Sequence, residues 1–191
     1  MKIALYFGTF NPVHIGHMAI ANYILEFNEI EQLWFIVSPQ SPFKQHENLL
    51  NNHQRLEMVQ RAIGNNPKYR ASDIEFKLPI PSYTIDTLKH LGEQHPQHEF
   101  YLIMGGDNLQ QLESWKGYET ILKNHHILAY PRPGYIIPSE YQNHPKIHIV
   151  NAPLMEISSS FIRKAIKEGK DMQYFLPHET WQYLMENRFY R

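Results

Sequence analysis

The sequence predicts an α/β protein with one doubly wound parallel sheet and helices on both of its faces. Short apolar runs alternate along the chain with segments of helical periodicity, which is typical of strands joined by right-handed helical crossovers. Glycine or proline closes several of the apolar runs. With 191 residues, the chain is long enough to bury a substantial core as a single domain, 1–191.

The first two strands are expected at 3–7 and 33–37. The first run ends at Gly8, and its apolar character suits a buried parallel strand. Between the two runs, apolar residues at helical spacing predict a helix that begins near Ile15. The polar segment 39–52 contains two prolines and is expected to be a long loop, a kind of segment that is often functional.

The same alternation continues to the end of the chain. An amphipathic helix is expected over 55–63, where Gly64 stops it, and Ser82 or Thr84 is expected to cap the next helix, which runs to residue 91. The remaining predictions are strands at 100–104, 127–129 and 147–150, and helices at 158–167 and 179–187. This is a Rossmann-like arrangement.

A sheet of this kind binds its ligands at the carboxyl ends of its strands. Gly8, Pro39 and Gly105 fall at three of those ends. We therefore expect the functional site to be formed by the segments that follow these three residues.

Composition excludes several classes of function. The 18 Lys+Arg nearly balance the 19 Asp+Glu, so a basic surface for nucleic acids or anionic membranes is not expected. The absence of cysteine excludes disulfides, thiolate catalysis and Cys-ligated zinc. No signal peptide is visible, and no apolar stretch approaches the ~20 residues of a membrane helix, so we expect a cytoplasmic protein. The sequence leaves its oligomeric state open, including a homo-oligomer.

The segment Gly8-Thr-Phe-Asn-Pro-Val-His-Ile-Gly-His17 runs from the first strand into the first helix. Gly8 permits a tight turn and the close approach of a ligand. His14 and His17 lie on one face of the first helical turn, where Gly16 adds no side chain and free backbone N–H groups favour an anion. Two imidazole donors at such a place can stabilise a phosphate whose charge grows in a transition state.

Two other interpretations of this histidine pair remain open. The imidazoles can cap the helix or bond to backbone groups. Together with His125 or His126 they can also provide three ligands for zinc, although the metalloprotease pattern needs a spacing of four residues and an intervening glutamate. We therefore predict no metal-ligating residues.

A second segment, Ile157-Ser-Ser-Ser-Phe-Ile-Arg163, leads into a helix near the end of the chain. Its serines can cap the helix and donate hydrogen bonds to an anion at the helix N-terminus. Arg163, one turn later, adds a planar fork of donors that suits phosphate oxygens. Taken alone, a serine run before a helix is usually just an ordinary cap.

Together, these two segments resemble the signatures of the adenylyl- and cytidylyltransferase superfamily. The first matches Gly-x-Phe-x-Pro-x-His-x-Gly-His, and the second matches Ile-Ser-x-x-x-Ile-Arg, with Ser160 where threonine is frequent. The resemblance implies that His14 and His17 stabilise the reacting phosphates of a nucleoside triphosphate and that Arg163 holds the triphosphate. The implied nucleotide-binding residues are Gly8, Thr9, Phe10, Gly16, Gly105, Asp107, Ile157, Ser158, Ser160 and Phe161.

The middle of the chain resembles the nicotinate mononucleotide adenylyltransferases. Residues 82–88 are similar to their Ser-Tyr-Thr-x-x-Thr-Leu element, and 105–109 to their Gly-x-Asp-x-Leu. Trp115 matches the aromatic residue that stacks on the pyridine ring. The implied substrate-binding residues are Lys44, Thr84, Thr87, Trp115 and Arg132. Simpler alternatives remain for Trp115 as a core aromatic, for Thr84 and Thr87 as helix caps, and for Arg132 as a surface cation.

The resemblance implies that ATP and nicotinate mononucleotide are the substrates and that Mg²⁺ arrives with ATP. The 5′-phosphate of the mononucleotide would attack the α-phosphorus of ATP, with His14, His17, Arg163 and Lys44 as the catalytic groups. Phe43 departs from the family pattern, which often has histidine there. Nicotinamide mononucleotide or phosphopantetheine as acceptor, a non-catalytic nucleotide sensor and a zinc hydrolase remain alternatives.

Overall fold

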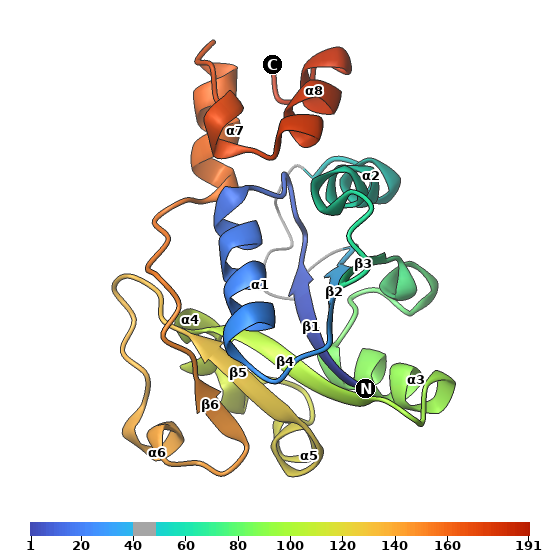
Figure 1. Cartoon of the computed structure of the whole chain (residues 1–191), viewed down its shortest axis with the longest axis vertical. Coiled ribbons are helices and arrows are strands. Elements are labelled where there is room, and N and C mark those ends of the chain that lie inside the picture. Colours follow the sequence, from blue (N-terminus) through green and yellow to red (C-terminus); the bar gives the residue numbers. More distant parts are fainter. Residues whose placement is uncertain (40–48) are drawn as a thin grey trace.

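One six-stranded parallel sheet forms the centre of the computed structural model, which describes residues 1–39 and 49–191 (Figure 1). The strands are β1 (Lys2–Gly8), β2 (Gln32–Val37), β3 (Tyr69–Ser72), β4 (Glu99–Gly105), β5 (His126–Tyr130) and β6 (Ile147–Ile149). Their order across the sheet is β3-β2-β1-β4-β5-β6. The direction of winding therefore reverses between β1 and β4, which is where such sheets bind ligands.

Helices cover both faces of the sheet, as the sequence predicts. They are α1 (Ile15–Phe27), α2 (Asn52–Ile63), α3 (Thr84–Gln94), α4 (Gly106–Leu109), α5 (Tyr118–Asn124), α6 (Ser139–Gln142), α7 (Ser159–Lys167) and α8 (His178–Glu186), with 3₁₀ turns η1 (Ile74–Lys77), η2 (Leu112–Ser114) and η3 (Gln173–Phe175). Helices α1 and α2 pack in one apolar cluster with Ala4 and Tyr6 of β1. Helices α3, α5 and α6 pack with Ile3 and Leu5, which point to the other face.

Helices α7 and α8 form a third apolar cluster with Phe189, and Figure 1 shows both at the top of the view, beyond the start of α1. Helix α8 is attached to α2, because the buried Thr180 hydroxyl donates a hydrogen bond to the carbonyl oxygen of Met58 at 3.0 Å. The last segment of the chain is thereby brought next to the carboxyl ends of the strands.

Several predicted boundaries are confirmed. Helix α1 begins at Ile15, and Ser158 caps α7 by accepting a hydrogen bond from the Phe161 backbone N–H at 3.2 Å. The expected cap of α3 is wrong. Tyr83 occupies the position before that helix, and the Ser82 hydroxyl instead donates to the carboxylate of Glu75 at 3.0 Å.

Strand β3 and helix α5 were not among the predicted elements. Strand β3 has four residues at the edge of the sheet, with too few apolar side chains to show a period. Helix α5 has only seven residues. Its N-cap is Gly117, which has a φ of 70° and no side chain to cap the helix, so the sequence carries no capping signal. Of the expected loop 39–52, residues 40–48 lie outside the described residues. None of the described helices is both long and apolar enough to cross a membrane.

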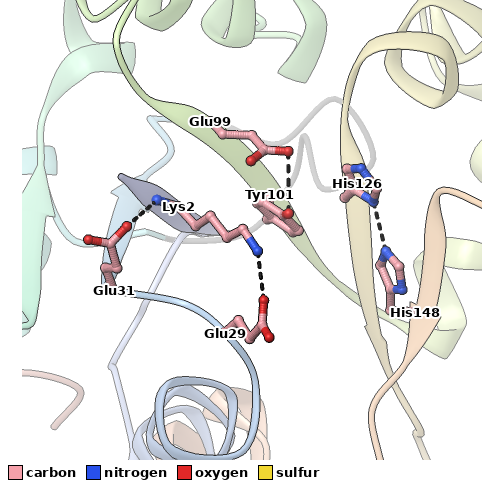
Figure 2. Close-up of polar contacts among 7 residues, drawn as sticks. All are labelled: Lys2, Glu29, Glu31, Glu99, Tyr101, His126 and His148. Carbon is pink, nitrogen blue, oxygen red and sulfur yellow. Dashed lines mark hydrogen bonds and ion pairs between the residues drawn. The ribbon is translucent and has the colours of Figure 1, made fainter.

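A group of seven polar and aromatic residues lies near the amino ends of the strands, and we call it the amino-end cluster (Figure 2). Its members are Lys2, Glu29, Glu31, Glu99, Tyr101, His126 and His148. The Lys2 ammonium forms an ion pair with Glu29 at 2.8 Å, and Nδ1 of His126 lies 2.7 Å from Nε2 of His148. This cluster is at the opposite end of the strands from the expected site.

Candidate active site

Two adjoining cavities open at the carboxyl ends of the strands. We call the first the aromatic cavity, because Phe7, Tyr83 and Trp115 line it, and the second the histidine cavity, because His14 and His17 line it. The residues common to both walls are Phe7, Gly8, Thr9 and Asn108. The end of β1 therefore separates two spaces that lie side by side at the point where the winding reverses.

The ring of Phe10 packs against the backbone of the loop that follows β1. A Cβ atom on Gly8 would lie only 2.9 Å from the ring of Phe10, so that ring occupies the place of a side chain. Phe10 is buried at 2% exposure and has a φ of 46°, in the left-handed region that non-glycine residues rarely adopt. Its ring also packs edge-on against His17, with centroids 5.2 Å apart. This packing fixes the loop relative to α1.

The two histidines of the first motif are stacked at the start of α1, with ring centroids 3.7 Å apart. The backbone N–H of His14 donates a hydrogen bond to Nδ1 of His17 at 3.2 Å. Because Nδ1 of His17 accepts this bond, its proton sits on Nε2. A Cβ atom on Gly16 would lie 3.0 Å from the His14 ring, which explains the glycine between the histidines.

His14 is almost fully buried, and its burial and then the charge of Arg132 lower its pKa from 6.5 to about 4. At neutral pH its imidazole is therefore uncharged. A neutral imidazole keeps one N–H group, which can donate a hydrogen bond to a phosphate oxygen.

The second motif lies directly against the first. The Ser159 hydroxyl donates to the carbonyl oxygen of Pro12 at 2.8 Å, and Nη1 of Arg163 donates to the carbonyl oxygen of Asn11 at 2.8 Å. Ser158, Ser160 and Arg163 line the histidine cavity. Segments about 150 residues apart in sequence thus bring two helix N-termini, those of α1 and α7, to one cavity, and such termini favour anions.

An ion pair closes the other side of the histidine cavity. Arg132 Nη1 lies 3.1 Å from Oδ2 of Asp107, and both side chains are partly exposed. Oδ1 of Asp107 is buried and has no hydrogen-bond donor among the described residues. A Cβ atom on Gly105 would lie 2.8 Å from Arg132 Cδ and 3.1 Å from the Tyr130 hydroxyl, so the pair needs glycine there.

Some predicted site residues lie elsewhere than expected. Arg132, expected among the substrate-binding residues together with Thr84 and Trp115, lines the histidine cavity instead of the aromatic cavity. Thr87 is fully buried and its hydroxyl donates to Oε1 of Glu75 at 2.7 Å, so it does not line the aromatic cavity. Phe161 is half exposed and its ring packs edge-on against Phe175.

Two further predictions concern the edges of the site. Ile157 lies beside Gly16, because a Cβ atom built on Gly16 would be 3.6 Å from the Cβ atom of Ile157. Lys44, predicted to contact phosphate, and Phe43 lie outside the described residues. The zinc alternative is not supported, because His126 lies in the amino-end cluster, away from His14 and His17, and the described residues contain no group that could hold a metal ion with three or more His, Cys, Asp or Glu side chains.

The aromatic cavity holds the predicted pair Thr84 and Trp115. Trp115 directly follows η2 and is half-buried. Its neighbour Lys116 also lines the cavity, forms an ion pair with Asp86 at 2.8 Å and lies 4.7 Å from the ring centroid of Tyr83. Lys116 was not predicted as a site residue, because a surface lysine after a tryptophan gives no signal of its own.

Glu75 is a second residue that sequence reasoning missed. It lines the aromatic cavity although it is only 2% exposed, and hydroxyls of Ser82 and Thr87 donate to its two carboxylate oxygens at 3.0 and 2.7 Å. A buried carboxylate is stable only when such donors satisfy it. Glutamate between Ile74 and Phe76 is the weak signal that could have drawn attention to it.

Arg55 is the third missed residue. It is fully buried in α2, and burial lowers its pKa to about 10. Its guanidinium donates to carbonyl oxygens at the end of β1 and β2, namely Thr9 at 2.5 Å, Ser38 at 2.7 Å and Pro39 at 3.1 Å. Its signal in the sequence is a cation on the same helical face as the apolar Met58 and Val59.

Comparisons with known proteins show the family of the chain. A family model described as cytidylyltransferase-like matches residues 5–165. A protein from Flavobacterium johnsoniae named "Probable nicotinate-nucleotide adenylyltransferase" is 52% identical over 100% of both chains. One of the same name from Bacteroides thetaiotaomicron is 45% identical over 97% of this chain and 92% of its own.

A solved structure has the same fold. It is the nicotinic acid mononucleotide adenylyltransferase of Plasmodium falciparum complexed with NaAD, with a TM-score of 0.84, 24% identity, and coverage of 99% of this chain and 97% of that one. The matched range 5–165 contains both histidines of the first motif, the serine run and Arg163. The chain therefore belongs to the nicotinate-nucleotide adenylyltransferases, within the cytidylyltransferase-like family.

Proposed function

We propose that this chain transfers the adenylyl group of ATP to nicotinate mononucleotide, forming nicotinate adenine dinucleotide and pyrophosphate. The observation that carries the proposal is the pair of adjoining cavities, with the two histidines in one, Trp115 in the other and the end of β1 between them. The names of the relatives and the NaAD complex of the structural neighbour support the choice of acceptor.

In this proposal ATP occupies the histidine cavity. Its phosphates lie at the N-termini of α1 and α7, where backbone N–H groups, the serines of α7 and Arg163 supply donors. Oδ1 of Asp107, buried without a donor among the described residues, is available to accept a bond from a ribose hydroxyl or a water.

The mononucleotide occupies the aromatic cavity. Trp115 offers a ring surface on which a pyridine can stack, and Thr84 supplies a hydroxyl beside it. Both ligands would then meet at Gly8 and Thr9, which line both cavities.

The chemistry needs no side-chain nucleophile. An oxygen of the mononucleotide 5′-phosphate attacks the α-phosphorus of ATP, a new P–O bond forms, the bond to the β-phosphate oxygen breaks, and pyrophosphate leaves with its electron pair. The protein contributes positioning and charge stabilisation. His14 and His17 donate to the α- and β-phosphates, and Arg163 and Lys44 steady the surrounding oxygens.

Mg²⁺ would enter with ATP. The described residues offer no cage of three or more acidic or histidine ligands, which fits an ion held mainly by phosphate oxygens and water. Oδ1 of Asp107, which has no donor within the part of the chain that the structure describes, could accept a hydrogen bond from one of those waters. When bound, the ion neutralises charge on the leaving pyrophosphate. The cytoplasmic location stays a prediction of the sequence, and the oligomeric state, including a homo-oligomer, stays open.

The test follows pyrophosphate release from ATP and Mg²⁺ with three acceptors in parallel, namely nicotinate mononucleotide, nicotinamide mononucleotide and phosphopantetheine. We expect release to be much faster with nicotinate mononucleotide. If release were faster with another acceptor, the proposed acceptor would be wrong, but the proposed adenylyl transfer would still hold. ATP binding without release from any acceptor would instead favour a nucleotide sensor.

A further inference from the structure

We propose that Tyr190 is a positioning residue for the loop that leads into His14 and α1 and that it acts through Asn11. The hydroxyl of Tyr190 donates a hydrogen bond to Oδ1 of Asn11 at 2.6 Å, across 179 positions of sequence. This inference rests on the proposed adenylyl transfer, which supplies one of its two readouts.

Asn11 is the point where this loop is held. It is 1% exposed and lies between Phe10, with its left-handed φ, and Pro12. Its Oδ1 also accepts a hydrogen bond from the Leu50 backbone N–H at 3.3 Å, and its carbonyl oxygen accepts the bond from Arg163. Three separate segments therefore converge on one residue, three positions before His14.

The end of the chain is shaped to bring Tyr190 to this point. Phe189 is buried in the third apolar cluster, where its ring lies 5.5 Å from that of Tyr183. The flanking residues Arg188 and Tyr190 adopt φ values of 53° and 64°, so the backbone reverses on each side of the anchored phenylalanine. Such conformations persist only where surrounding contacts enforce them. Here they direct the tyrosine ring inward from α8.

The surroundings keep the Tyr190 hydroxyl protonated, so that it can donate. Burial raises its pKa strongly, while the charges of Arg163 and Arg55 act in the opposite direction. These are the charged groups that act on the hydroxyl from α7 and α2. A tyrosine in this setting is a neutral donor at every pH at which the protein is assayed.

The consequence for catalysis is geometric. Residues 10–13 are all buried and lead directly into His14, whose backbone N–H in turn orients His17. A small shift of Asn11 therefore moves both imidazoles relative to the phosphates. Displacements of about 1 Å in such a site can lower a rate about a hundredfold, so even a partial shift is measurable.

The test is Tyr190→Phe, which removes only the hydroxyl. We expect kcat for pyrophosphate release to fall about three- to tenfold, the effect of one lost hydrogen bond, while the KM values for both substrates change by less than about twofold. The matched control is Tyr174→Phe, because Tyr174 lies in the same C-terminal part but is 84% exposed. Unchanged kcat in Tyr190→Phe, with or without a lower melting temperature, would overturn the proposal.

A double-mutant cycle tests whether the effect passes through Asn11. We expect Asn11→Ala with Tyr190→Phe to have the same kcat as Asn11→Ala alone. If the double variant lost kcat by the product of the two single effects, Tyr190 would not act through Asn11.

A second readout does not depend on activity. The imidazole NMR resonances of His14 and His17 should shift in Tyr190→Phe and stay in place in Tyr174→Phe. If the unmodified protein released no pyrophosphate, the proposed function would fail, and these resonances would still decide the positioning role.

Discussion

The two ends of the sheet carry similar side chains in very different settings. The amino-end cluster joins His126 to His148 and Lys2 to Glu29, whose carboxylate side chain is 90% exposed (Figure 2). The carboxyl end holds another histidine pair, the buried His14 and the half-buried His17, stacked at the start of α1. Residue type alone therefore does not locate the site in this protein.

Backbone geometry makes the difference. At the carboxyl ends, the N-termini of α1 and α7 face one cavity, so unpaired N–H groups and positive dipole ends gather there. At the amino ends, exposed charged side chains pair with each other in water, where such ion pairs contribute little to the free energy of folding. Hydrogen-bond donors that the fold has already desolvated and fixed stabilise a bound ligand more than mobile surface charges do.

The largest expected effect is that of His17→Ala. We expect kcat to fall by roughly 10²- to 10³-fold, as for the loss of one donor aimed at a developing charge, while the protein stays folded. Single-turnover measurement of pyrophosphate release would isolate the chemical step. Full activity in this variant would remove the assigned role of the carboxyl-end pair.

A pH dependence of stability should follow from the burial of His14. Its pKa is about 4 in the folded protein against 6.5 as its ordinary value, so the unfolded chain takes up a proton first as pH falls. Stability from this group is complete above pH 6.5 and is lost progressively between pH 6.5 and 4, by at most about 3 kcal/mol.

Denaturant unfolding at pH 7 and pH 5 of the natural protein and of His14→Gln measures this contribution as a difference. Burial also lowers the pKa values of His95, His125 and His126, but these groups are common to both proteins and cancel. Equal losses in both proteins would contradict a buried neutral His14.

Trp115→Ala should have a smaller and selective effect. Loss of a stacking surface is expected to raise the KM for nicotinate mononucleotide about tenfold, since stacking of a base on an aromatic ring is worth about 1–3 kcal/mol. The KM for ATP, which has no contact with Trp115 in the proposed arrangement, serves as the internal control. A similar rise for both substrates would argue against stacking.

The smallest effect is expected at the amino end. His126→Gln breaks the contact with His148 but should leave kcat unchanged and alter the free energy of unfolding by less than about 0.5 kcal/mol, the usual range for surface substitutions. A clear loss of activity would mean that the two ends of the sheet are coupled through β5, and the contrast between them would no longer hold.

Motifs with a fixed local spacing could be predicted from the sequence. The histidine pair and the serine run are such motifs, and the structure brings both to one cavity. Strands β1, β2, β4, β5 and β6 could also be predicted, because they are apolar runs. Short elements such as β3 could not, since four residues at a sheet edge show no period.

The supporting contacts of the site were beyond the sequence for a different reason. Arg55 donates hydrogen bonds to the carbonyl oxygens of Thr9, Ser38 and Leu50, which belong to three separate segments. Because any backbone carbonyl can accept such a bond, no residue pattern marks these partners. The hydroxyl of Thr87 was expected to bind substrate and instead satisfies Glu75. Which of two neighbouring hydroxyls faces a cavity depends on tertiary packing.

The thin boundary between the two cavities has a consequence for inhibitor design. Because Gly8 and Thr9 border both spaces, one molecule that joins an adenosine-like group to a pyridine-like group through a short anionic bridge could fill both at once. Linking the two halves would let the second bind at a high effective concentration, so affinity could exceed that of either fragment by orders of magnitude.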